Sequence, residues 1–187
     1  MKRLSTAFVF LLLGTSLPAY AEMAAGEHPN GAIGFHNVEA PVGVRWWLSG
    51  QKVGIDFGLG FSSRSAEPEG FPDEQLSSWA IDAGVPFVWH SWHHAHMLFR
   101  PGILYESEQV VAPAAPPFDT ADQTRLTASL EIEGEIYLVD NFSVSASTGI
   151  GFVNFDPAGG DNQTTFTTIG RNFTTVGFHL YFFGSEP

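Results

Sequence analysis

Cysteine is absent from this chain of 187 residues, and positive charge is scarce. Without cysteine there are no disulfides, thiolate metal sites or cysteine nucleophiles. The 8 Lys and Arg residues stand against 20 Asp and Glu residues, a net charge of −12, so nucleic-acid binding is excluded as an expectation. No segment has the ~20 apolar residues that a membrane-spanning helix needs. The length is that of a single domain.

The first 21 residues have the pattern of a secretory signal peptide. Lys2 and Arg3 form its positive end, residues 7–13 its apolar stretch, and residues 19–21 an Ala-Tyr-Ala cleavage site. We therefore expect a mature chain that begins at Glu22, with residues 22–187 forming one domain.

Apolar and small or polar side chains alternate with a period of two along the mature chain, which is the periodicity of a β-strand. In residues 53–61, for example, Val, Ile, Phe, Leu and Phe alternate with Gly and Asp. We predict an all-β fold whose eight strands span 31–38, 41–48, 53–64, 78–90, 96–107, 125–138, 142–155 and 172–183.

The predicted connections alternate between tight turns and long loops, except that the first, around Glu39 and Ala40, is short where a longer loop would be expected. The turns are 49–52, 91–95 and 139–141, and the loops, which are polar or rich in Pro and Gly, are 65–77, 108–124 and 156–171. An even number of strands with this alternation is typical of an eight-stranded antiparallel up-and-down transmembrane β-barrel. Pro86 and Pro101 each remove one backbone donor from adjacent strands, so we expect a bulge near them.

The two faces of the strands differ in a way that favours lipid outside the barrel. One face is large and almost uncharged, whereas the other is rich in Gly, Ser and acidic residues, which are too small or too polar to fill an apolar core. Aromatic residues fall into two groups, as expected for rings at both membrane interfaces. Those beside the tight turns are Trp46, Trp89, Trp92, Phe142 and Phe182, and those beside the long loops are Phe61, Trp79, Tyr105 and Phe152.

The end of the chain and its general layout resemble a known family. Thr175, Gly177, Leu180 and Phe182 match the C-terminal assembly signal of bacterial outer-membrane barrels, although a further Phe and a four-residue tail follow. The layout is similar to small barrels of the OmpA transmembrane domain and OmpX type, and residues 40–61 look like their second and third strands. The resemblance implies a Gram-negative outer-membrane location and assembly by the barrel-assembly machinery, but no single activity.

The predicted register across the first tight turn places Arg45 opposite Asp56 inside the barrel, where we expect an ion pair. An eight-stranded barrel is only wide enough to be filled by side chains. We therefore expect a closed polar lumen rather than a porin-like channel. The residues of this predicted network are Arg45, Asp56, Asp82, Arg100, Glu131, Glu133 and Glu135, with Glu106 also facing inward.

Four histidines surround the turn at residues 91–95. His90 and His96 are expected to face each other across the hairpin, close enough to share a transition metal. His93 and His94 are further candidate ligands. No nearby carboxylate or cysteine completes a structural zinc site. We therefore favour a polar turn at the membrane interface that binds no metal. For the chain as a whole we expect no other cofactor and no catalytic residue.

Sequence alone predicts a structural or surface-interaction role in contact with outer-membrane lipid and lipopolysaccharide. The loops are acidic, so shared divalent cations or basic proteins are expected partners, and the extracellular ligand stays open. Two alternatives remain. One is a secreted or periplasmic lipocalin-like barrel that binds a small apolar ligand, and the other is a membrane-embedded lipid-modifying enzyme.

Overall fold

A computed structural model describes residues 29–35, 37–48, 50–66, 74–111, 120–167 and 174–183. The expected signal peptide and the expected start at Glu22 lie outside these residues. Within them the fold is all-β without helices, and no helix meets the length and apolarity needed to cross a bilayer. The strands are β1 (Gly31–Phe35), β2 (Val42–Trp47), β3 (Gly54–Ala66), β4 (Glu74–Gly84), β5 (Phe87–Trp92), β6 (Ala95–Val111), β7 (Thr120–Val139), β8 (Phe142–Asp156), β9 (Gln163–Thr167) and β10 (Thr174–Phe183).

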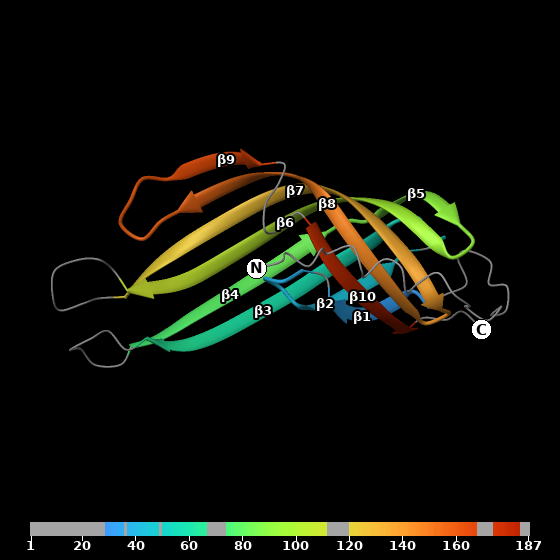
Figure 1. Cartoon of the computed structure of the whole chain (residues 1–187), viewed down its shortest axis with the longest axis horizontal. Helices are drawn as coiled ribbons and strands as arrows, with labels where there is room; N and C mark the ends of the chain where they lie inside the picture. Colours follow the sequence, from blue (N-terminus) through green and yellow to red (C-terminus); the bar gives the residue numbers. More distant parts are fainter. Residues whose placement is uncertain are drawn as a thin grey trace, which may run out of the picture.

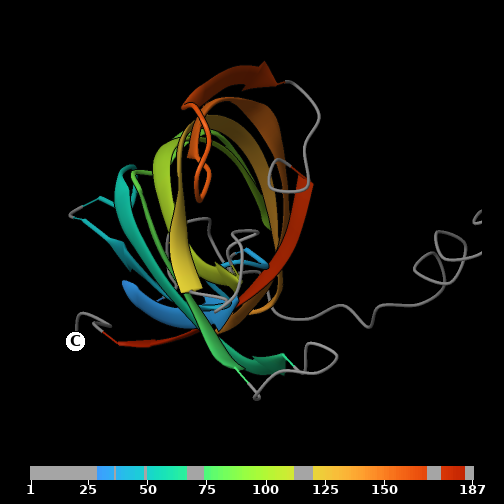
Figure 2. The same ribbon diagram turned by 90° about the vertical axis from the view of Figure 1, so that its left-hand side faces the viewer.

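These strands form a closed barrel, which Figure 1 shows from the side and Figure 2 from the end with the long hairpins. Neighbours pair antiparallel, and β10 closes the ring by pairing with both β1 and β8. β5 continues β4 along β6, while β9 and β10 pair with successive parts of β8. The structure therefore confirms the predicted eight-stranded up-and-down antiparallel barrel.

The irregularity expected from the prolines is present between β4 and β5. The chain leaves the regular ladder at Val85 and Pro86, where the Pro86 carbonyl accepts a hydrogen bond of 2.8 Å from the Gly54 amide. Pro101 stays inside β6, and its carbonyl accepts from the Val85 amide at 3.0 Å. The Val85 amide and the carbonyls of Pro86 and Pro101 are therefore hydrogen-bonded at the break, although proline cannot donate.

The hairpins at the long-loop end extend further than predicted. β6 runs to Val111 and β7 begins at Thr120, so strand pairing covers most of the predicted loop 108–124. The predicted loop 156–171 is wrong in part, because Gln163–Thr167 returns along β8 as β9. Its sequence, Gln-Thr-Thr-Phe-Thr, is rich in residues that favour strands, and the Pro/Gly-rich segment before it supplies the turn.

Small apolar clusters are found near both ends of the barrel interior, with charged side chains between them. Near the tight turns, Ala32, Trp47, Leu98 and Tyr181 pack together. Towards the long hairpins, Ala40, Ala80 and Leu104 form a second cluster. The large apolar side chains of the alternating pattern lie on the outer surface instead.

Candidate functional site

The interior of the barrel holds all seven residues of the network predicted from the sequence. They lie at inward positions of β2, β3, β4, β6 and β7, and each is at most 6% exposed. The inward positions follow from the two-residue period of the strands, which carries every second side chain to the same face. The structure thus brings into one cluster residues separated by up to 90 positions in the chain.

Arg45 is the centre of one half of this network. It is the register partner of Asp56, as expected from the tight turn, and its Nε and Nη2 donate to the two carboxylate oxygens at 2.8 and 2.9 Å. Across the lumen, Nη2 also reaches Glu133 at 2.9 Å, and Nη1 reaches Glu135 at 3.1 Å. One guanidinium thus links three carboxylates through charge-assisted hydrogen bonds, which suits its fixed fork of donors.

Arg100 organises the other half and shares Asp56 with Arg45. Its Nε donates to the second oxygen of Asp56 at 2.9 Å, its Nη1 to Glu131 at 3.1 Å, and its Nη2 to Asp82. Two arginines and five carboxylates therefore form one connected network. Because breaking a buried ion pair leaves an uncompensated charge, this network holds the walls of the barrel together and occupies its middle.

Two glycines make room for the Arg100 guanidinium. Gly84 and Gly102 are register partners on β4 and β6, and a Cβ on either would collide with the Arg100 side chain. Glycine inside a strand often marks such a close approach. The strand sequence therefore contained a signal for the position of this arginine.

Hydroxyl groups donate further hydrogen bonds to carboxylate oxygens of the network. Ser143 and Tyr181 donate to the same oxygen of Glu135, and Nδ1 of His179 lies 3.4 Å from it. Ser129 and Ser147 donate to Glu131 at 2.8 and 3.0 Å. The carboxylates therefore depend on hydrogen bonds from neutral groups as well as on the arginines, as buried charge requires.

An aromatic cluster near the tight turns was not predicted. The Trp47 indole N–H donates to the Tyr181 hydroxyl at 3.3 Å, and the ring of Tyr137 lies 5.7 Å from that of Tyr181 and 5.2 Å from that of His96. The strand alternation carries the signal, since Trp47 follows Arg45 by two positions and Tyr181 follows His179 by two. Bulky rings therefore narrow the lumen at this end.

The expected arrangement of the histidines is wrong. The turn is formed by His93 and His94 alone, and an irregularity between Val88 and His90 shifts the register, so that His96 pairs with Ser91 rather than with His90. His96 is buried, whereas the other three histidines of the cluster are exposed. Within the described part of the chain, no group of three or more His, Cys, Asp or Glu side chains is arranged to hold a metal ion.

The four residues that resemble an assembly signal lie on β10, the strand that closes the barrel. Thr175 and Gly177 face inward, where the Thr175 hydroxyl is 2.6 Å from that of Ser147. Leu180 and Phe182 are exposed on the outer surface. The pattern of the signal thus coincides with alternation between a lumen face and an apolar outer face.

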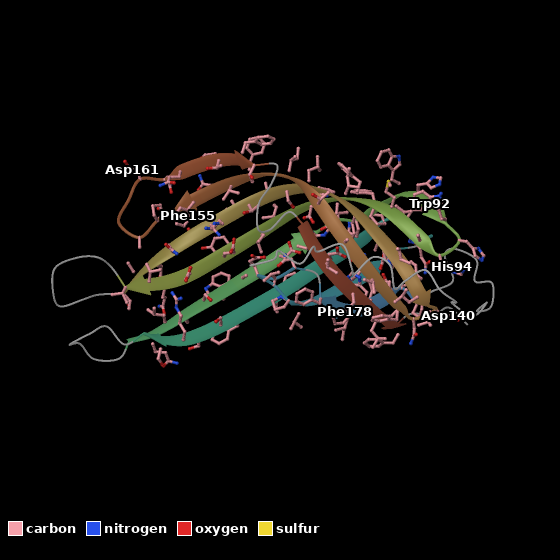
Figure 3. All side chains as sticks on the ribbon, in the orientation of Figure 1. Trp92, His94, Asp140, Phe155, Asp161 and Phe178 are labelled. Atoms are coloured by element: carbon pink, nitrogen blue, oxygen red, sulfur yellow. The ribbon has the colours of Figure 1, made fainter. Side chains whose placement is uncertain are left out.

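A half-open cavity of about 300 Å³ lies at the mouth of the barrel, on the side of the long hairpins. Its lining comes from the segment before β2 and from β3, β4, β6, β7 and β8. Figure 3 shows the two ends of the barrel. Trp92, His94 and Asp140 mark the end with the tight turns, and Phe155 and Asp161 lie towards the other end, where Phe155 lines the cavity. Its lining residues are Val38, Glu39, Pro41, Gly60, Phe61, Ser62, Ser78, Trp79, Ala80, Glu106, Ser107, Glu108, Gln123, Thr124, Arg125 and Phe155.

In comparisons with known proteins, no protein family, no curated protein and no solved structure matches the chain. The barrel itself, with its charged interior, its apolar outer surface and the cavity at one mouth, is therefore the basis for the proposed function.

Proposed function

We propose that this chain is a small outer-membrane β-barrel protein with a closed polar lumen and a structural or surface-interaction role. The observation that carries the proposal is the distribution of apolar side chains over the outer wall. Large apolar residues are exposed on the outer face of the strands from β1 to β10. They include Ile33, Val44, Phe57, Ile81, Ile132 and Val176. A continuous apolar surface of this size is unusual on a soluble monomer and suits hydrocarbon.

The height of the apolar wall supports the same proposal. On β7 the outward residues Leu126, Leu130, Ile132, Ile136 and Leu138 are all exposed. Strands rise about 3.3 Å per residue, and barrel strands tilt by roughly 40°, so the span from residue 126 to residue 138 corresponds to about 30 Å along the barrel axis. This is the thickness of a hydrocarbon core.

Aromatic rings border this wall at both ends. Trp89 and Trp92 are exposed beside the tight turns, and Phe61 and Phe152 are exposed beside the long hairpins. Rings of this kind favour the two interfaces between lipid and water. In the proposed orientation, the tight turns lie in the periplasm and the cavity lies on the exterior side.

The charged interior favours a closed polar lumen over the lipocalin-like alternative. A carrier of a small apolar ligand needs an apolar interior, whereas here Arg45, Arg100 and their five carboxylate partners occupy the middle of the barrel. The same side chains fill the space that an aqueous channel would need. In planar bilayers we therefore expect no steady conductance.

The proposed partners follow from the location. The outer wall contacts membrane lipid, and the acidic exterior end contacts lipopolysaccharide through shared divalent cations. The alternating pattern Thr175, Gly177, Leu180 and Phe182 on β10 is proposed to be read by the barrel-assembly machinery. We assign no enzymatic step to the chain.

The test is fractionation of cells that make the full-length chain, followed by gel electrophoresis of the detergent extract with and without boiling. We expect the protein in the outer-membrane fraction, with a mobility that changes on boiling because the barrel resists the detergent until it is heated. A periplasmic or secreted product that is released without detergent and shows no mobility change would overturn the proposal in favour of the soluble carrier.

A further inference from the structure

We propose that the cavity at the exterior mouth binds a neutral, polyhydroxylated ligand, namely a saccharide of one or two rings. Its volume of about 300 Å³ is at the lower end of the range of small-molecule sites. The inference goes beyond the structural role of the barrel and rests on the proposed function only in that the cavity then faces the exterior.

The floor of the cavity is closed, so a ligand would stop there rather than pass. Ala80 lines the cavity and belongs to the buried cluster with Ala40 and Leu104. Two positions further along β4, Asp82 is held by Arg100. The mouth is therefore a blind pocket above the charged plug, which distinguishes a binding site from a conduction path.

The polar groups around the pocket are planar and are held in place by one another. Glu106 and Arg125 are register partners with a closest N–O distance of 3.7 Å. Gln123 donates to one oxygen of Glu108 at 3.0 Å, and Arg64 reaches the other oxygen at 3.2 Å. Carboxylate, amide and guanidinium groups together offer several donors and acceptors, which is what a ring carrying neighbouring hydroxyl groups requires.

Apolar groups also line the same pocket. The Arg125 guanidinium lies over the Phe155 ring at 5.3 Å, and Val38 and Pro41 add apolar surface from the segment before β2. Glu106, Arg125 and Phe155 are consecutive register partners across β6, β7 and β8. The pocket thus combines apolar surface with a few fixed polar groups, as small-molecule sites do.

The existing ion pairs favour a neutral ligand over a charged one. Two of the three lining glutamates, Glu106 and Glu108, already face the cations Arg125 and Arg64. A charged ligand would have to compete with these pairs, whereas hydroxyl groups can add hydrogen bonds to both members. Because the pairs are partly exposed, they cost little to rearrange.

The test uses the full chain purified in lauryldimethylamine oxide, whose head group is not a sugar. Binding is first surveyed on a printed array of neutral and acidic saccharides, and the affinity for the best neutral saccharide is then measured by calorimetry. We expect saturable binding of at least one neutral saccharide of one or two rings. Absence of binding across the array, or binding of acidic saccharides alone, would overturn the proposal.

Variants locate the site. Ser62→Trp fills the mouth without removing an ion pair, and Arg125→Gln removes a charged donor fork; each should weaken binding at least tenfold. Asp161→Asn removes one charge at the same end of the barrel but outside the pocket, and should leave the affinity unchanged. Each variant is first checked for the far-UV circular dichroism of the unaltered protein, so that loss of folding is not read as loss of binding.

Equal affinities for Ser62→Trp and the unaltered protein would place the ligand elsewhere and refute the proposed site. Binding by purified protein does not depend on where the protein lies in the cell. A negative binding result therefore leaves the outer-membrane proposal intact, and a soluble location would not remove the pocket.

Discussion

Replacing Ile132 by arginine distinguishes a wall that faces lipid from one that faces water. Ile132 lies halfway along the apolar stretch of β7 and is 47% exposed. If the wall faces lipid, this residue is close to the bilayer midplane, where an outward arginine costs about 2–4 kcal/mol. In water, a substitution at such a surface position typically changes stability by about 0.5 kcal/mol or less.

Leu138→Arg is the matched control on the same strand and face. Leu138 is 46% exposed, and six residues at about 3.3 Å with a tilt of roughly 40° place it about 15 Å from Ile132 along the axis. That distance is half of the hydrocarbon thickness, so its cost should fall to about 0–1 kcal/mol.

The assay is urea unfolding of the protein refolded into lipid vesicles, followed by tryptophan fluorescence. We expect Ile132→Arg to lower the free energy of unfolding by at least about 1 kcal/mol more than Leu138→Arg. Indistinguishable unfolding curves for the two variants would refute the lipid-facing wall, since depth in the bilayer is what separates the two positions.

Three further predictions concern the interior. Arg45→Met removes the guanidinium that Glu133 and Glu135 share and leaves Asp56 with Arg100 as its arginine partner. It should cost about 3–5 kcal/mol in the same urea assay; an unchanged unfolding midpoint would contradict the network. Gly84→Ala places a Cβ against the Arg100 side chain and should lower the free energy of unfolding by about 1–3 kcal/mol. Gly134→Ala, with no atom within 4 Å of the added Cβ, should not destabilise the barrel by crowding. Equal losses of stability in the two variants would show that crowding is not the cause. Calorimetric titration with zinc should show no micromolar site that depends on His96, because this side chain is buried and its neighbouring histidines are exposed; a site abolished by His96→Ala would show this to be wrong.

The sequence-based prediction succeeded where a regular alternation ran unbroken and failed where an irregularity interrupted it. Arg45 and Asp56 follow from one tight turn and a regular two-residue period, so their pairing was predictable. His90 and His96 were placed opposite each other on the same assumption, but the shift between Val88 and His90 changes the register. A slip of one residue moves a side chain to the other face of a strand.

Strand content beyond the main runs was also underestimated. The loop containing Gln163–Thr167 looked irregular because of the Pro and Gly residues that precede this segment. In the structure those residues form the turn, and the strand after it pairs with β8. Short strands of this kind are stabilised by pairing with a neighbour, which local composition does not report.

The alternation in the sequence is enough to predict an all-β barrel with one polar and one apolar face, because the two-residue period assigns every side chain of a regular strand to one face or the other. The same period predicts which charges face inward. How those charges are connected follows only from closure of the barrel, because Arg45 meets Glu133 and Glu135 across the lumen and Arg100 fits against two glycines of different strands. The cavity at the mouth likewise exists only after closure, since its lining comes from five strands and one connecting segment that no local pattern brings together.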